Sequence, residues 1–206
     1  MNNENKREKE KNVAIFLRGG SGVGKSTLAK ALVRLIPFSA KIDVDELRYM
    51  ISGGLVASRG NVKPYYNPKE YLRQCRLADK NAFALVRNFL DAGFIPVIDG
   101  MNGGESSEIF YFKKKPSDIL WYPHPDVLSR EMPGIKVIQI VLDAPPGVLI
   151  ERLKLKGHDN ETIGFILSQR EIFLNTLSDE SIDCVADTSK RDPRFIAKQI
   201  IKKFRL

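Results

Sequence analysis

The sequence predicts an α/β fold: a single domain with a five-stranded parallel sheet and helices on both of its faces. Five short apolar runs alternate with segments of helical pattern along the chain. The runs are apolar on both faces, which is typical of parallel strands that are covered on both sides. The chain has 206 residues and 43% of them are apolar, which is enough to bury one core.

The expected strands and helices follow one another in a regular order. The strands are the apolar runs at 13–18 (VAIFLR), 40–43 (AKID), 94–99 (FIPVID), 136–143 (KVIQIVLD) and 183–187 (DCVAD). The helices lie between and after them, at about 25–36, 44–53, 68–92, 146–156, 159–176 and 192–204. This alternation indicates parallel strands joined by helical crossovers.

Three stretches fall outside the alternation. The residues at 1–12, MNNENKREKEKN, mix charges and lack an apolar core, so we expect a disordered leader rather than a secretory signal. The segment at 54–67 and an excursion at about 112–134 are long for connections in a compact α/β domain. Such loops are usually lids or face a substrate. We therefore expect one domain at 13–206 that carries both.

Composition limits the function classes. No run of eighteen apolar residues occurs, so we expect no membrane span. Cys75 and Cys184 show no metal or redox spacing, which favours reduced thiols and a cytoplasmic protein. The net charge is +8, but seven Lys and Arg against one Asp from Lys190 onward place +6 of it in the tail. The apolar spacing there already predicts a packed helix with a solvated face, so this charge is weak evidence for nucleic acid.

A phosphate-binding motif follows the first strand. Gly19, Gly24, Lys25 and Ser26 satisfy G-x-x-x-x-G-K-[ST] between a strand and a helix. Glycines let successive N–H groups turn inward, and the helix N-terminus points at the same place. Lys25 reaches the β- and γ-phosphates, and the Ser26 hydroxyl is a ligand for Mg²⁺. The expected nucleotide-binding residues are Gly19, Gly20, Ser21, Gly22, Val23, Gly24, Lys25, Ser26 and Thr27.

The base is expected to be adenine. A GTPase normally shows N-K-x-D after a late strand, and the strings ADKN and TSKRD do not match it. ATP is therefore the expected nucleotide.

Two aspartates end the second strand, in IDVDELR. Ligands bind at the carboxyl ends of parallel strands, so Asp43 and Asp45 are expected on the rim that holds the phosphates. Either carboxylate can accept the proton of an attacking hydroxyl or orient Mg²⁺ through water. Arg48 lies one helical turn further and can hold an anionic acceptor or steady the transferring group. The alternative is that Asp45 caps a helix at 46–53.

The third strand ends in VIDGMNGG. Asp99 resembles the carboxylate that holds the water shell of the metal opposite Ser26, so the two are the expected Mg²⁺ site. The alternative is an aspartate in a turn before glycine.

Together, GGSGVGKST, IDVDELR, VIDGMN and VADTS resemble the small P-loop kinases. The closest subset is polynucleotide kinase, chloramphenicol phosphotransferase and the zeta-toxin kinases, and the resemblance covers 13–205. It implies a sheet order of 2-3-1-4-5, with Asp45 as general base and Arg48 facing the acceptor.

The resemblance also implies a lid after the fourth strand, at about 152–170. Its first phosphate-facing arginine falls on Arg152, for which a helix-surface cation is the alternative. A second arginine is common in the family, and this chain offers Lys154, Lys156 and later Arg170. The loop after VADTS borders adenine in such kinases, which places Thr188, Ser189 and Arg191 nearby.

The function expected from these residues is ATP- and Mg²⁺-dependent transfer of the γ-phosphoryl group to a hydroxyl of a small molecule. In this reading Lys25 neutralises charge and Asp45 takes the proton of the acceptor. His124 and His158 lie outside the motifs and are expected to be surface side chains rather than catalysts.

Two other functions stay open. Phosphorylation of a polynucleotide 5′-hydroxyl needs a basic channel with stacking aromatics. Its candidates are Arg48, Arg59, Lys63, Tyr65, Tyr66, Arg73 and Arg76, with Trp121 and Tyr122 as a cap. An ATP-binding regulatory or toxin–antitoxin module would use the excursion as a partner surface, but it has no need of Asp45.

Overall fold

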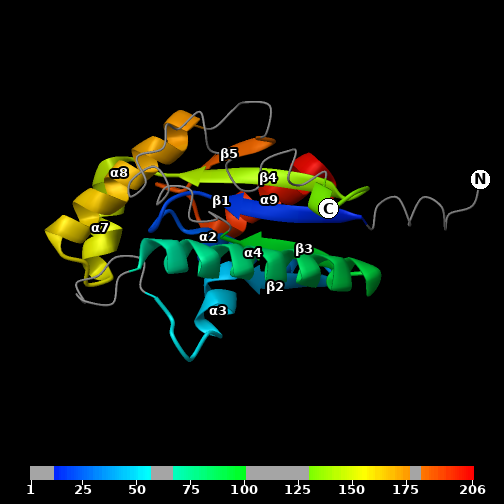
Figure 1. Ribbon diagram of the computed structural model, residues 1–206. Coiled ribbons are helices and arrows are strands. Elements are labelled where there is room, and N and C mark those ends of the chain that lie inside the picture. Colours follow the sequence, from blue (N-terminus) through cyan, green and yellow to red (C-terminus); the bar gives the residue numbers. More distant parts are fainter. Residues whose placement is uncertain (1–11, 57–66, 101–129, 177–181) are drawn as a thin grey trace, which may run out of the picture.

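The computed structural model describes residues 12–56, 67–100, 130–176 and 182–206. They form a parallel sheet with helices on both faces (Figure 1). The expected leader, most of the 54–67 segment and most of the 112–134 excursion lie outside the described residues, and so do Arg59, Lys63, Tyr65, Tyr66, Trp121, Tyr122 and His124.

The sheet has the order β2-β3-β1-β4-β5 and all of its strand pairs are parallel. The five strands are β1 (Val13–Arg18), β2 (Ser39–Asp43), β3 (Ile95–Asp99), β4 (Lys136–Asp143) and β5 (Cys184–Asp187). The expected order is confirmed, and every strand begins and ends within one residue of its expected bounds. All six residues of β1 are buried. Its first five, Val13–Leu17, are apolar because a central parallel strand is covered on both faces, and the sixth is the buried Arg18.

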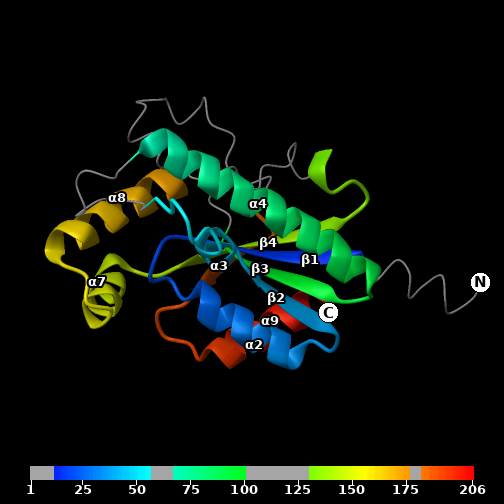
Figure 2. The same ribbon diagram turned by 60° about the horizontal axis from the view of Figure 1, so that its bottom comes forward.

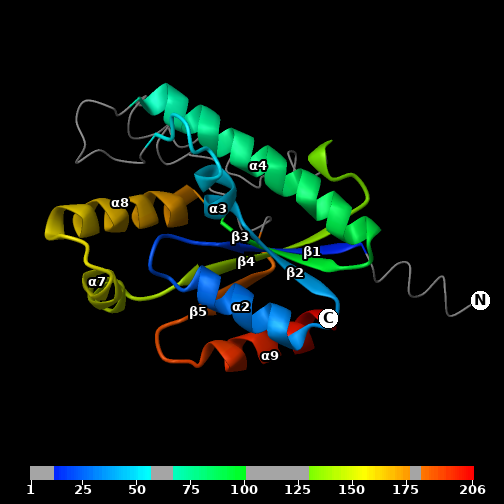
Figure 3. The same ribbon diagram turned by 90° about the horizontal axis from the view of Figure 1, so that it is seen from below.

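The helices form two layers and an end cluster. They are α2 (Lys25–Leu35), α3 (Val44–Tyr49), α4 (Pro68–Asp91), α7 (Pro146–Leu155), α8 (Asn160–Thr176) and α9 (Pro193–Phe204). Helices α2 and α9 cover one face of the sheet and α4 covers the other (Figure 3). Helices α7 and α8 lie beyond the carboxyl ends of the strands (Figure 2).

Alternate side chains of β1 belong to two separate hydrophobic cores. Ile15 and Leu17 pack with α2 and α9, whereas Ala14 and Phe16 pack with α4. Successive strand side chains point to opposite faces, so both layers are anchored to the same strand. The phosphate motif directly follows that strand, and Val23 of the motif belongs to the core that includes α2 and α9.

One helix is shorter than expected. The helix expected at 44–53 ends at Tyr49, because Ser52, Gly53 and Gly54 follow and Gly54 adopts a φ of 82°, a backbone state that glycine tolerates best. The capping alternative for Asp45 is also wrong. The cap is Asp43, whose carboxylate accepts a hydrogen bond from the Glu46 N–H at 3.4 Å, and Asp45 lies within the first turn.

Within the described parts of the chain, no helix is long and apolar enough to cross a bilayer.

Candidate nucleotide and acceptor site

The loop between β1 and α2 is built from glycines that the backbone requires. Gly19, Gly22 and Gly24 have positive φ angles of 139°, 82° and 99°. A Cβ atom on Gly19 would lie 2.4 Å from the carbonyl oxygen of Leu142. The start of the loop is thus pressed against β4, and α2 begins at Lys25 without a side-chain cap. A helix N-terminus of this kind is suited to bind phosphate.

The Lys25 side chain crosses the loop. Its Nζ donates hydrogen bonds to the carbonyl oxygens of Gly19 and Gly20, at 2.9 and 3.1 Å. Burial lowers the pKa of Lys25, while Asp99, Asp45 and Asp43 oppose that change. The charges that act on the amine therefore come from two strand ends, Asp43 and Asp99, and from Asp45 in the first turn of α3. Its position at the phosphates stays a prediction.

Asp99 ends β3 beside Asp43 of β2, its partner in the sheet register. It is only 3% exposed, and its Oδ2 has no hydrogen-bond partner among the described residues. Burial raises the pKa of Asp99, whereas a hydrogen bond with Ser26 and the charge of Lys25 lower it. The structure thus brings Ser26 and Asp99 together, as the sequence analysis expected.

This pair fits Mg²⁺. The donors are a hydroxyl and a buried carboxylate of which one oxygen accepts no hydrogen bond from the described residues, and Mg²⁺ prefers oxygen ligands while keeping several waters. In the described parts of the chain, no three His, Cys, Asp or Glu residues gather as a metal cluster. Mg²⁺ held through few protein ligands, water and phosphate is consistent with that.

Lys41 is a charged member of the site that sequence reasoning missed. Its Nζ lies 2.6 Å from Asp43 Oδ2 and 3.8 Å from Asp99 Oδ2. The signal was present in the sequence, since residues two apart on a strand share a face. Asp43 is thereby both a helix cap and an ion-pair partner, while Asp45 is exposed on α3.

Arg48 is held by backbone and aromatic contacts. It is buried, its Nη1 donates to the Val56 carbonyl oxygen at 2.8 Å, and its guanidinium lies 5.1 and 5.2 Å from the Tyr49 and Tyr71 ring centroids. Its expected role toward the acceptor stays a prediction. The contact that the structure shows is between α3 and the segment that follows it.

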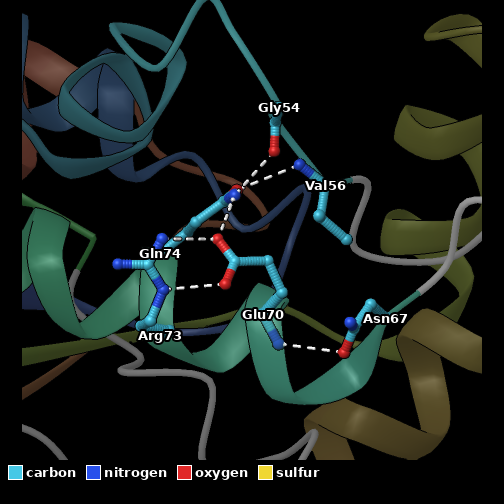
Figure 4. Close-up of polar contacts among 6 residues, drawn as sticks. All are labelled: Gly54, Val56, Asn67, Glu70, Arg73 and Gln74. Carbon is cyan, nitrogen blue, oxygen red and sulfur yellow. Dashed lines mark hydrogen bonds and ion pairs between the residues drawn. The ribbon is translucent and has the colours of Figure 1, made fainter.

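Gln74 of α4 also holds the segment that contains Gly54 and Val56 (Figure 4). Its Oε1 accepts a hydrogen bond from the Val56 N–H at 2.9 Å, and its Nε2 donates to the Gly54 carbonyl and to Glu70, both at 2.8 Å. Sequence reasoning missed Gln74, since a glutamine within a helical pattern carries no signal of burial. Arg48 and Gln74 together fix the backbone of Val56.

Arg73, a candidate for a polynucleotide channel, is already paired. Its side chain is 71% exposed and bonds to both carboxylate oxygens of Glu70, at 2.7 and 2.8 Å. The same glutamate donates its backbone N–H to Asn67, the cap of α4 (Figure 4).

Arg152 and Arg170, the two arginines of the segment expected to form a lid, have different surroundings. Arg152 of α7 donates to the Thr188 carbonyl at 2.6 Å and to the Thr188 hydroxyl at 3.1 Å, with a longer contact of 3.5 Å to the Gly22 carbonyl. Arg170 of α8 pairs with both oxygens of Asp143, at 2.7 and 2.6 Å. The ideal Cβ position of Gly20 is 3.6 Å from the Cβ of Arg170, so Arg170 lies directly beside the phosphate loop.

A cavity of about 430 Å³ opens next to the loop. It has an apolar wall from Val23, Leu28 and Ile196, and Thr188 and Arg191 border it. Mostly apolar pockets with a few polar groups are typical of small-molecule sites. Thr188 and Arg191, which the sequence analysis expects near the base, thus border a cavity beside the loop, and Arg152 lines it too. The position of the base itself stays a prediction.

Comparisons with known proteins give the same fold. A family model described as an AAA domain matches residues 15–174. No curated protein sequence is significantly similar to the chain. Shikimate kinase from Bacteroides thetaiotaomicron matches with a TM-score of 0.57 at 19% identity, over 94% of this chain and 99% of that one.

Two further solved structures are similar. Thymidylate kinase from Candida albicans has a TM-score of 0.65 at 17% identity, over 93% of this chain and 92% of that one. APS kinase from Mycobacterium tuberculosis, in complex with AMPPNP and APS, has a TM-score of 0.56 at 14% identity, over 95% and 98%. At these identities the likeness establishes a shared fold.

Proposed function

The chain belongs to the AAA domain family and has the fold of P-loop kinases, and we propose that it transfers the γ-phosphoryl group of ATP to a hydroxyl of a small molecule. The observation that carries this proposal is the Lys25 amine in the phosphate loop, 2.9 and 3.1 Å from the Gly19 and Gly20 carbonyl oxygens. Burial lowers the pKa of this amine, and the charges of Asp99, Asp45 and Asp43 oppose that change. A protein that only binds nucleotide needs the lysine and the metal-side carboxylate. It has no need of a further exposed carboxylate on the rim.

The proposed reaction is an in-line displacement. The acceptor oxygen forms a bond to the γ-phosphorus while the bond from that phosphorus to the β–γ bridging oxygen breaks, and the acceptor proton passes to Asp45. Lys25 and the loop N–H groups stabilise the charge on the phosphate oxygens. With Ser26 and Asp99 holding it, Mg²⁺ supplies further positive charge at the phosphates.

The lid arginines take separate roles in this proposal. Arg170 is beside Gly20 and is paired with Asp143, so we assign it to the transferring phosphate. Arg152 borders the cavity with Thr188, and we assign it to the nucleoside side while keeping its expected catalytic role as the competing assignment. In this proposal Arg170 exchanges the carboxylate of Asp143 for the transferring phosphate. A guanidinium can bind either group, because both anions accept two hydrogen bonds from its paired N–H donors.

The structural neighbours support the general class. Shikimate kinase, thymidylate kinase and APS kinase are named as kinases of small molecules, and one of them is in complex with AMPPNP, an analogue of ATP. This favours ATP as donor and a small acceptor for the present chain.

A polynucleotide 5′-hydroxyl is the second candidate acceptor. Lys69, Arg73, Arg76 and Lys80 line one groove on α4, and a row of cations is suited to track a phosphate backbone. The ion pair of Arg73 with Glu70 reduces the charge that this row offers.

The test follows the radiolabelled γ-phosphate of ATP with Mg²⁺. The protein is given a 5′-hydroxyl oligonucleotide or a panel of nucleosides, sugars, polyols and antibiotics. We expect label on a small hydroxylated compound. Label on the oligonucleotide selects the second candidate, and ATP binding without transfer to any compound selects a regulatory module.

An Asp45→Asn variant tests the proposed base. We expect it to bind ATP as the wild type does and to lose transfer by about 10²- to 10⁴-fold, the usual contribution of a general base. Full activity in this variant would move the role to Asp43 or remove it.

A further inference from the structure

Lys41 contacts two carboxylates at the carboxyl end of the sheet. Asp43 of β2 and Asp99 of β3 are partners in the parallel register, so they end neighbouring strands side by side. The Lys41 Nζ lies 2.6 Å from Asp43 Oδ2 and 3.8 Å from Asp99 Oδ2. Two carboxylates so placed repel each other, and one ammonium group offsets that repulsion.

These groups lie on the face of the sheet that α2 covers. Lys41 and Asp43 are two residues apart on a strand and so share a face, and Val97, the register partner of Lys41, packs in the core that includes α2. Asp99 forms a hydrogen bond with Ser26 in the first turn of α2. Lys41 therefore contacts the same carboxylate that, with Ser26, fits Mg²⁺.

The cluster can be reached from solvent through Asp43. The side chains of Lys41 and Asp43 are 21 and 23% exposed, whereas that of Asp99 is 4% exposed. An ion from solvent can therefore approach Asp43, whose Oδ2 already binds the Lys41 ammonium.

Lys41 reduces the negative charge that a free metal ion would find. Lys25 acts on the same two carboxylates as well, so two ammonium groups oppose them. Mg²⁺ gives up its water reluctantly and is usually held by one or two carboxylates together with substrate phosphates. The phosphates of ATP bring the negative charge that the two lysines offset.

We propose that Lys41 excludes free Mg²⁺ from Asp43 and Asp99, so that the metal binds at this rim only together with ATP. Lys41 is a positioning residue in this role, because it acts through the two carboxylates and its charge sets the order in which metal and nucleotide bind. The inference rests on the proposed function for the identity of the metal and the nucleotide. It goes beyond that function by assigning Lys41 control over when the metal enters.

The test is a titration of the nucleotide-free protein with Mn²⁺, which suits the same oxygen ligands as Mg²⁺ and is followed by electron paramagnetic resonance. Lys41→Met and Lys41→Gln remove the charge, whereas Lys41→Arg keeps it. Lys198→Met is the matched control, because it removes an exposed lysine from α9.

The expected result is a gain in metal affinity. Both neutral variants should bind Mn²⁺ at least about tenfold more tightly than the wild type, since a unit charge near a divalent ion repels it by about that factor even in bulk water. Lys41→Arg and Lys198→Met should bind Mn²⁺ as the wild type does. Adding Asp99→Asn to a neutral variant should abolish the gain.

Thermal unfolding is an independent measurement of the same effect. Without metal, the neutral variants should melt below the wild type, because two neighbouring carboxylates lose a counter-charge. Mg²⁺ added without nucleotide should raise the melting temperatures of these variants and leave that of the wild type unchanged, since a ligand that binds only the folded state stabilises it. Lys41→Gln can still donate a hydrogen bond to Asp43, and it covers the case in which Lys41→Met does not fold.

Other outcomes would overturn the inference. A wild type that binds Mn²⁺ without nucleotide as tightly as the neutral variants do would remove the role of Lys41. A gain that persists after Asp99→Asn would mean that the metal binds elsewhere. Transfer is followed separately in the radiolabel assay, so its absence would overturn the proposed function while the metal titration still decides the role of Lys41.

Discussion

Replacing Gly19 with alanine tests how the phosphate loop is held against the sheet. Gly19 has a φ of 139°, and its added Cβ would lie 2.4 Å from the Leu142 carbonyl oxygen. A non-glycine residue in this backbone region costs about 1–3 kcal/mol. The contact is about 1 Å shorter than van der Waals contact and involves a backbone atom. We therefore expect the clash to lower the free energy of unfolding by about 1–3 kcal/mol more, as overpacking does.

Gly24→Ala is the matched control. Gly24 also has a positive φ, of 99°, but its added Cβ has no atom within 4 Å. It therefore carries the backbone cost of about 1–2 kcal/mol without the clash. The difference between the two variants isolates the close approach of the loop to β4.

The assay is thermal unfolding of both variants by circular dichroism. For a chain of this size 1 kcal/mol corresponds to about 2–4 °C, so the clash cost of about 1–3 kcal/mol should make Gly19→Ala melt about 2–12 °C below Gly24→Ala. Equal melting temperatures would refute the reasoning, because they would mean that the loop and β4 separate at no cost.

Three further outcomes are expected from the site. Lys25→Met should remove transfer and weaken ATP binding while the protein stays folded, which a melting curve with and without ATP checks. Arg170→Ala should cost less than about 1 kcal/mol of stability, since its ion pair with Asp143 is partly exposed, and should still lower the transfer rate in a single-turnover assay; an unchanged rate would contradict its assignment. Stability should fall as pH rises from about 4 to about 7, because burial raises the pKa of Asp79 to about 7 and the group keeps its proton in the folded state over that window but loses it when unfolded. Over that window the free energy of unfolding should fall by on the order of 4 kcal/mol. Melting temperatures measured across pH 4–8 should fall with pH in the wild type, and this fall should be absent in Asp79→Asn.

The sequence pattern within short windows was sufficient to predict most of the fold. Strands apolar on both faces and the glycine-rich turn before α2 are signals within short windows, and each expected strand agrees with the structure to within one residue. The error at α3 has a local cause. Its pattern continued beyond Tyr49, but Asp43 rather than Asp45 caps the helix and the glycines after Ser52 end it.

The site was only partly predictable, since some of its contacts join distant segments. Lys41 on β2 pairs with Asp99 on the neighbouring strand β3. Arg152 on α7 donates to the carbonyl oxygen of Thr188, which follows β5. Gln74 and Asp79 are buried polar residues on a helix whose sequence pattern does not distinguish them from surface positions.

By itself, the sequence determined the strand–helix alternation, the phosphate loop and the rim on which Asp45 and Asp99 lie. Each of these follows from neighbours in the chain and from the rule that parallel strands end at one edge. Only the tertiary structure decided that Arg48 donates to the Val56 carbonyl oxygen and that Asp79 is buried. The reason is physical: burial and pairing depend on which elements pack together, and α3 and α4 are in contact in the folded structure although residues 50–67 separate them in the sequence.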